Sequence, residues 1–289
     1  MTEPVSVWSL GAELGEGPVW VERDRALWFA DIKKRKVHRY DPAAATGRSW
    51  DSPEQVGFVL PAASGGFIAG LQSGLHRFDP ENGWFEPLAA VEADRPTNRL
   101  NDGVVDPSGR LWFGSMDDGE RGKSGSFYRY QEGAVVPSGI RGIAITNGPA
   151  VSPDGRILYW VDTVGGDIWA CDVHDDGTLG PSRGFARIDP KDGHPDGPTV
   201  DAQGHVWVGL YAGWEARRFS PAGEVSGRLR FPVANITKIA FGGEDLRTVY
   251  ATTARQLLAP EALALQPQAG DLFEAQVDVP GLPSHLIAA

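Results

Sequence analysis

The sequence is poor in features that mark several large classes of protein. Its 289 residues include one cysteine, Cys171, so no disulfide can form within the chain, which fits a reducing compartment. No apolar run approaches the roughly 20 residues that a membrane-spanning helix needs. Residues 1–4 lack the basic and apolar segments of a signal peptide. We therefore expect a cytoplasmic protein that does not bind a membrane.

Positive charge is also scarce. The chain carries 27 Lys and Arg against 38 Asp and Glu, a formal net charge of −11. A nucleic-acid-binding protein usually presents a basic surface, whereas the one basic run here, residues 33–36, is short and typical of a solvated hairpin. We expect no nucleic-acid partner.

Long amphipathic helices are absent as well, and only residues 260–265 have the pattern of a helical turn. Short alternating segments rich in Trp, Tyr, Phe and Val dominate instead. They form six repeats, and their aromatic anchors lie 39, 45, 47, 48 and 43 residues apart, which is typical of four-stranded propeller blades. The anchors are Trp28, Phe67, Trp112, Tyr159, Trp207 and Tyr250.

These repeats predict an all-β fold, a six-bladed β-propeller with four-stranded blades. Because a propeller closes into a ring, we expect residues 5–8, which precede the first full repeat, to pair with the last blade. No linker-like or low-complexity stretch divides the chain, so we expect residues 1–289 to form a single domain, and we expect a monomer.

Four polar motifs share one register. In three of them Gly follows Glu16, Asn147 or Asp196 and Pro comes next; the fourth is Asn101-Asp102-Gly103, with Val in place of Pro. Glu16, Asp102, Asn147 and Asp196 lie 10 to 12 residues before their anchors, at the start of each blade's first strand. Alone, each motif would be an ordinary turn. Since first strands line the channel of a propeller, we expect the four side chains to face one another at one mouth.

Two carboxylates and an amide oxygen around one point form a site for a hard cation. On ligand type this set suits Ca²⁺, Mg²⁺ or Mn²⁺, while Zn²⁺ and Fe²⁺ usually bring histidine, which the set lacks. A cation would also offset the repulsion between the two carboxylates.

Several segments, in order, resemble the senescence-marker-protein/gluconolactonase/regucalcin-like family, and the resemblance spans nearly the whole chain. It implies a six-bladed propeller with one divalent metal at the channel mouth, held by Glu16, Asn147 and Asp196. Because some similar lactonases use Fe²⁺, the metal stays open among Ca²⁺, Mg²⁺, Mn²⁺, Zn²⁺ and Fe²⁺. The segments are residues 14–18 (LGEGP), 99–103 (RLNDG), 146–149 (TNGP), 152–155 (SPDG), 195–197 (PDG) and 241–243 (FGG).

The resemblance also implies contacts with a substrate. Asn101 would contact the substrate or a metal-bound water, and Arg99 would hold substrate hydroxyl or carbonyl oxygens. In many members a glutamate shortly after a Gly-Thr-Met segment contacts sugar. Here Gly114-Ser115-Met116 is followed by both Asp118 and Glu120, and both are candidates.

The Asn-Gly-Pro form of the motif at residues 147–149 resembles bacterial sugar lactonases such as xylonolactonase and L-arabinonolactonase. The function implied is that of a metal-dependent lactonase of pentose oxidation, which hydrolyses an aldonolactone such as D-xylonolactone or L-arabinonolactone. In this interpretation Asp196 is the general base and Asn101 orients the ring or the oxyanion. The alternatives are a gluconolactonase, an arylester or organophosphate hydrolase of the same fold, and a calcium-binding regulatory propeller without turnover.

Four other residues have two interpretations each. Tyr211 and Trp214 would either pack on a sugar face or serve as core or loop aromatics, and His194 would either touch substrate or remain solvated. Lys238 begins the last blade's inner strand and is expected to point towards the channel, with or without a role in charge balance.

Overall fold

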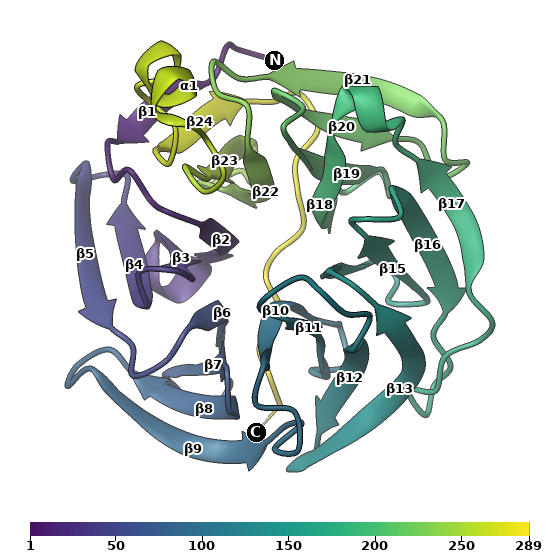
Figure 1. The fold of residues 1–289 in the computed structure, drawn as a ribbon. Helices are drawn as coiled ribbons and strands as arrows, with labels where there is room; N and C mark the ends of the chain where they lie inside the picture. Colours follow the sequence, from purple (N-terminus) through teal and green to yellow (C-terminus); the bar gives the residue numbers. More distant parts are fainter. Residues whose placement is uncertain (289) are drawn as a thin grey trace.

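The computed structural model describes residues 1–288. It confirms the predicted architecture, since six four-stranded antiparallel sheets stand as blades round a central axis (Figure 1). In each of the first five blades the chain runs outward from the axis, strand by strand. Blade 1 consists of β2 (Gly15–Val21), β3 (Ala26–Asp31), β4 (Lys36–Asp41) and β5 (Thr46–Asp51). Blade 2 consists of β6 (Val56–Pro61), β7 (Phe67–Leu71), β8 (Gly74–Asp79) and β9 (Trp84–Ala90).

The next three blades repeat this order. Blade 3 consists of β10 (Asn98–Val105), β11 (Leu111–Asp117), β12 (Gly125–Gln131) and β13 (Ala134–Ile143). Blade 4 consists of β14 (Thr146–Val151), β15 (Ile157–Asp162), β16 (Asp167–Asp172) and β17 (Arg183–Arg187). Blade 5 consists of β18 (His194–Val200), β19 (Val206–Tyr211), β20 (Glu215–Phe219) and β21 (Val225–Arg230).

Blade 6 closes the ring as predicted. Its inner strands are β22 (Ile236–Gly242), β23 (Thr248–Thr253) and β24 (Leu272–Gln276), and its outer strand is β1 (Val5–Trp8), which pairs antiparallel with β24. The first and last parts of the chain therefore share one sheet. The predicted helical turn is the short helix α1 (Pro260–Leu265), in the insertion between β23 and β24.

The six aromatic anchors all lie on the second strand of their blade, and each is at most 3% exposed. They pack between blades as well as within them. The ring centroids of Trp28 in blade 1 and Phe67 in blade 2 are 4.3 Å apart, and Tyr250 in blade 6 stacks on Trp20 in blade 1 at 5.9 Å. Because large aromatic side chains bury much apolar surface, these contacts hold the blades in the ring.

A buried polar contact accompanies the tryptophan anchors. In blades 1, 3 and 5 the indole N–H of the anchor donates to an aspartate of the preceding turn. In blade 3 the acceptor is Asp106, 2.8 Å from the Trp112 nitrogen, and the same carboxylate accepts from Arg110 Nε at 2.6 Å. A buried tryptophan N–H needs such a partner, which explains the Asp in these turns.

The C-terminal segment, residues 277–288, crosses the ring on one face (Figure 1, yellow trace). The Ser284 hydroxyl donates to the Trp20 carbonyl in blade 1 at 2.7 Å, and the Ile287 N–H donates to the Pro61 carbonyl in blade 2 at 3.0 Å. The segment thus ties blades together at the end of the axis where the first strands finish.

Replacing Asp106 with alanine should lower the free energy of unfolding by about 3–5 kcal/mol, because the buried Arg110 guanidinium and the Trp112 indole N–H lose their acceptor. Urea-induced unfolding measures this as a lower midpoint. Asp154→Ala, in the matching turn of blade 4, is the control because Asp154 is exposed. Equal midpoints for the two variants would contradict the assignment of Asp106.

Candidate metal and substrate site

The first strands that carry the predicted site residues are irregular at those residues. In β2, β10, β14 and β18 the pairing register shifts immediately at or after the polar motif. Such β-bulges bend a strand and re-aim its side chains. The glycines of the motifs permit this geometry. Gly17 and Gly148 have φ of 57° and 78°, and a Cβ on Gly148 would lie 2.7 Å from Pro198 Cγ of the next blade.

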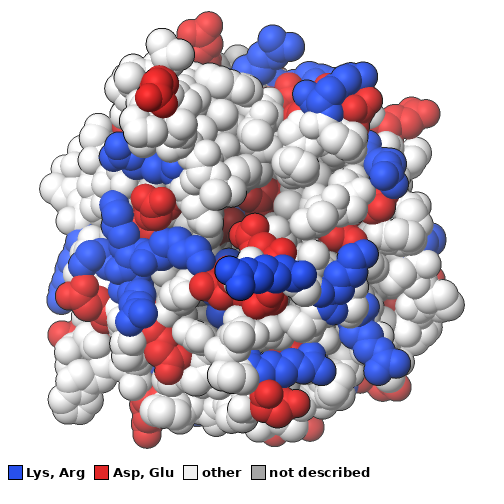
Figure 2. Space-filling view, viewed as in Figure 1, with Lys and Arg blue, Asp and Glu red and all other residues white. Residues whose placement is uncertain are grey.

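A cavity of about 430 Å³ opens where these strands begin. All six predicted site residues line it, namely Glu16, Arg99, Asn101, Glu120, Asn147 and Asp196. They come from blades 1, 3, 4 and 5. The repeat register predicted the convergence of three of them, Glu16, Asn147 and Asp196, and the family resemblance implied the other three. The space-filling view shows acidic side chains within the hollow at the centre of this face (Figure 2).

The carboxylates of Glu16 and Asp196 are the chemical core of the cavity. Each residue is 4% exposed. Burial, and then the charge of Asp102, raises the pKa of Glu16 to about 8. Burial, and then the charge of Glu16, raises the pKa of Asp196 well above its usual range. Asp196 Oδ1 is buried and has no hydrogen-bond partner among the described residues.

This arrangement fits a divalent cation. An unpartnered buried oxygen and two carboxylates that resist ionisation side by side are what a cation site presents from the protein's side. Within residues 1–288 no three His, Cys, Asp or Glu side chains gather as a metal site. A cation at Glu16 and Asp196 would therefore need neutral oxygen donors as well, and the amide of Asn147 lines the same cavity.

Asn147 is held by a chain of hydrogen bonds between side chains. Arg99 Nη1 donates to Asn101 Oδ1 at 2.5 Å, and Asn101 Nδ2 donates to Asn147 Oδ1 at 2.9 Å. Asn147 Nδ2 donates in turn to Thr163 Oγ1 at 2.9 Å. Because both amide nitrogens in this chain donate to a defined partner, the orientation of both asparagines is defined, and the oxygen of Asn147 is kept on the side of Asn101.

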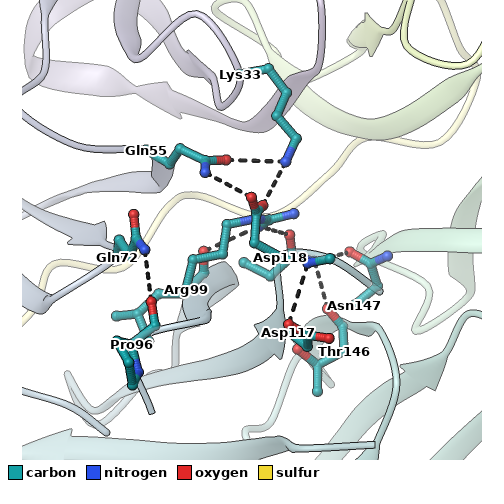
Figure 3. A network of polar contacts seen from close by, with 12 residues as sticks. Lys33, Gln55, Gln72, Pro96, Arg99, Asp117, Asp118, Thr146 and Asn147 are labelled. Carbon is teal, nitrogen blue, oxygen red and sulfur yellow. Dashed lines mark hydrogen bonds and ion pairs between the residues drawn. The ribbon is translucent and has the colours of Figure 1, made fainter. Parts of the chain in front are cut away.

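Arg99 is itself fixed from behind by Asp118 (Figure 3). The Asp118 carboxylate accepts from Arg99 Nε at 2.8 Å, Lys33 Nζ at 2.5 Å and Gln55 Nε2 at 2.9 Å. Partial burial disfavours ionisation, but the hydrogen bonds from Gln55, Lys33 and Arg99 outweigh it and lower the pKa of Asp118 to about 2. Of the two acidic candidates, Glu120 lines the cavity, whereas Asp118 anchors the arginine.

The expectation that Asp102 faces the mouth with the other three is wrong. Its side chain points into the channel beneath the cavity, where both carboxylate oxygens lie 2.7 Å from Lys238 Nζ and also accept the N–H groups of Gly103 and Gly148. Successive residues of a strand point to opposite sides, so Asn101 takes the place at the mouth and Asp102 does not. Lys238 points towards the channel, as predicted.

Other cavity residues were not singled out from the sequence. Thr163, Asn235 and Gln256 line the cavity from loops, where no shared register marks them. Of the residues left open, Tyr211 and His194 line the cavity and Trp214 does not. The Tyr211 hydroxyl donates to the Gln256 carbonyl, so this aromatic also braces a loop.

Fold and site together define a class: a six-bladed propeller with an oxygen-donor pocket at one end of its axis. The family model described as SMP-30/Gluconolactonase/LRE-like region matches residues 14–255, and the chain belongs to this family. No helix in the described part of the chain is long and apolar enough to cross a membrane.

Three relatives illustrate the family. The chain is 36% identical to a 6-deoxy-6-sulfogluconolactonase of Pseudomonas putida, over 95% of each chain. It is 35% identical to an L-arabinolactonase of Azospirillum brasilense, over 95% of this chain and 92% of that one. A crystal structure of regucalcin from Agrobacterium tumefaciens, described as a calcium-binding protein, superposes with a TM-score of 0.95 at 28% identity, over 98% of this chain and 97% of that one.

Chelator-treated protein should lose stability as pH rises from about 4.5 to about 8. The pKa of Glu16 is raised to about 8 in the folded state, so folded Glu16 keeps its proton over this range while unfolded Glu16 ionises. Glu16→Gln should flatten the curve of unfolding free energy against pH, whereas Glu86→Gln, at an exposed position on β9, should not. Parallel curves for all three proteins would show that Glu16 is not the buried acid described.

Proposed function

We propose that this protein is a metal-dependent sugar lactonase, a carboxylic ester hydrolase that opens an aldonolactone to the aldonic acid. The observation that carries the proposal is the unpartnered Oδ1 of Asp196, buried in a cavity that also contains Glu16, Asn147, Asn101 and Arg99. The names of two relatives that match 95% of the chain, a sulfogluconolactonase and an L-arabinolactonase, support the same chemistry.

Glu16, Asn147 and Asp196 would hold the divalent cation. When bound, it would polarise the lactone carbonyl and lower the pKa of a water molecule. The cavity carboxylates leave Ca²⁺, Mg²⁺, Mn²⁺, Zn²⁺ and Fe²⁺ as candidates, and the regucalcin structure described as calcium-binding supports Ca²⁺ among them.

Asp196 is the proposed general base. It accepts the proton of the attacking water, whose oxygen bonds to the carbonyl carbon. The ring C–O bond then breaks, and Asp196 returns the proton to the departing ring oxygen, which becomes a hydroxyl group. A carboxylate has two oxygens, so one oxygen of Asp196 would face the cation while the other accepts the proton, and Oδ1 has no hydrogen-bond partner in the described protein that would compete for it.

Arg99 and Asn101 are proposed to position the substrate. Asp118 fixes the guanidinium, which leaves it pre-organised to donate to ring hydroxyls. Both N–H groups of Asn101 already donate, to Thr146 O and Asn147 Oδ1, so its contribution is to orient Asn147 and to offer its own oxygen to a hydroxyl. All of these residues belong to one chain, and we propose that the monomer is the functional unit.

The first substrates to test are the pentonolactones D-xylonolactone and L-arabinonolactone, because of the Asn-Gly-Pro motif and the L-arabinolactonase relative. A sulfonated lactone matches the cavity less well. The acidic residues lining it are Glu16, Glu120 and Asp196, and the one Lys or Arg among its described lining residues is Arg99, which already pairs with Asp118. Gluconolactone is the comparison substrate.

Asp196→Asn should lower kcat by about 10²–10⁴-fold, since the amide cannot accept the water's proton. The assay strips the protein with chelator, restores one divalent metal at a time and follows acid release from pentono- and hexonolactones. Asp189→Asn, an exposed aspartate outside the cavity, is the control and should keep wild-type activity. Unchanged turnover in Asp196→Asn would remove Asp196 from the reaction.

The same assay separates the alternatives. Metal binding without turnover of any lactone would favour a calcium-binding propeller, and turnover of phenyl esters alone would favour an arylesterase.

Glu120→Gln should raise KM for the lactone severalfold and leave kcat nearly unchanged, because Glu120 lines the cavity without joining the carboxylate pair. Glu132→Gln is a matched control: Glu132 is also an exposed glutamate with positive φ, but it lies in the β12–β13 turn away from the cavity. An unaltered KM would mean that Glu120 makes no contact with the substrate.

A further inference from the structure

Two large apolar side chains are exposed at the rim of the candidate site. Leu257 is 80% exposed and Val164 is 59% exposed, and both line the cavity that contains Glu16 and Asp196. They come from loops that follow second strands, β23 and β15, whereas the polar site residues Glu16, Asn147 and Asp196 stand on first strands at the axis. The cavity therefore has a polar floor and, on the side of Leu257 and Val164, an apolar part of the rim; Glu120 and His194 are the exposed polar residues that also line it.

The exposure of Leu257 is built into the backbone. Leu257 has φ of 63°, the left-handed region that a bulky residue rarely adopts. The residues beside it are tied down: the Gln256 N–H donates to the Glu13 carbonyl at 2.9 Å, and the Gln256 carbonyl accepts from Asn235 Nδ2 at 3.1 Å as well as from the Tyr211 hydroxyl. A strained residue that its surroundings hold in place points to function more than to a slack loop.

The apolar character continues inward from the rim. Three more aliphatic side chains line the cavity: Met116 on β11, Ile145 in the loop between β13 and β14, and Leu258 in the loop after β23. A ligand in this cavity therefore meets carboxylate and amide groups at the floor and aliphatic surface on the side of the opening formed by Leu257 and Val164. Such a division suits a molecule with one polar end and one apolar end.

We propose that Leu257 and Val164 form a specificity lip that contacts the exocyclic end of the lactone and favours a methyl group there over a hydroxymethyl group. This inference rests on the proposed function. The ester carbonyl must reach Asp196 on the floor, so the exocyclic carbon of the ring points towards the rim. A hydroxyl against Leu257 and Val164 gives up water without gaining a partner, whereas a methyl group gains apolar contact. The substrate class is that of terminal deoxy-aldonolactones.

The test uses a matched pair of substrates: the pentono-1,4-lactone that the protein opens fastest and its 5-deoxy analogue, which differ by one hydroxyl. The wild-type protein should prefer the deoxy lactone by about tenfold in kcat/KM, the scale at which an apolar pocket separates a group from its hydroxylated counterpart. Leu257→Asn should reduce the preference to about twofold. Asparagine tolerates the left-handed backbone, so this variant changes polarity while keeping the fold.

Two further variants sharpen the result. Val164→Thr should also weaken the preference, and Leu257→Met, which keeps an aliphatic contact, should retain most of it. Leu265→Asn and Val225→Thr, at residues that are 85% and 49% exposed but outside the cavity, should leave the preference unchanged.

The failures are distinguishable. If no lactone is hydrolysed with any metal, the proposed function is overturned and the lip with it. If lactones are hydrolysed but wild type lacks the preference, or Leu257→Asn retains it in full, the proposed function stands and the lip does not.

Discussion

The close approach of buried carboxylates at the propeller axis is the interaction on which this site depends. Ring closure brings the first strands together, and the buried polar side chains at their starts then line one cavity. Three buried carboxylates lie in this region, those of Glu16, Asp102 and Asp196. Lys238 forms an ion pair with Asp102 and neutralises that charge. Two remain, and one divalent cation or retained protons must compensate them.

Hydrogen bonds around the two carboxylates fix the side chains beside them. Hydrogen bonds from Gln55, Lys33 and Arg99 keep the pKa of Asp118 low. The ion-pair partner of Arg99 is therefore Asp118, which lies outside the pair formed by Glu16 and Asp196. Arg99 then aligns the amide of Asn101, and that amide aligns Asn147. The cavity thus keeps its acidic floor while its amide oxygens stay in place, which is the pre-organisation that a cation or a polar substrate requires.

The sequence was sufficient for features that repeat. Six aromatic anchors at regular steps predict six blades, and a register of 10 to 12 residues before them predicts that Glu16, Asn147 and Asp196 converge. The sequence was insufficient where the outcome depends on the direction in which a single side chain points. The motif alone does not show whether Asn101 or its neighbour Asp102 faces the mouth. At the local bulge the side chain of Asn101 points to the mouth and that of Asp102 points to Lys238. Loop residues such as Thr163 carry no repeat and gave no signal.

The same contrast explains how specificity is divided. Floor residues stand on strands whose pairing leaves little freedom, so the chemistry they allow is set by the fold and its glycines. Rim residues stand on loops, where a leucine can be held out in the left-handed backbone at small cost to the blades. Leu257 and Val164 lie on loops of different blades, so under the proposed function changes there would alter which lactone fits without disturbing the carboxylates beneath. A propeller of this kind can therefore keep one reaction and vary its substrate through the rim alone.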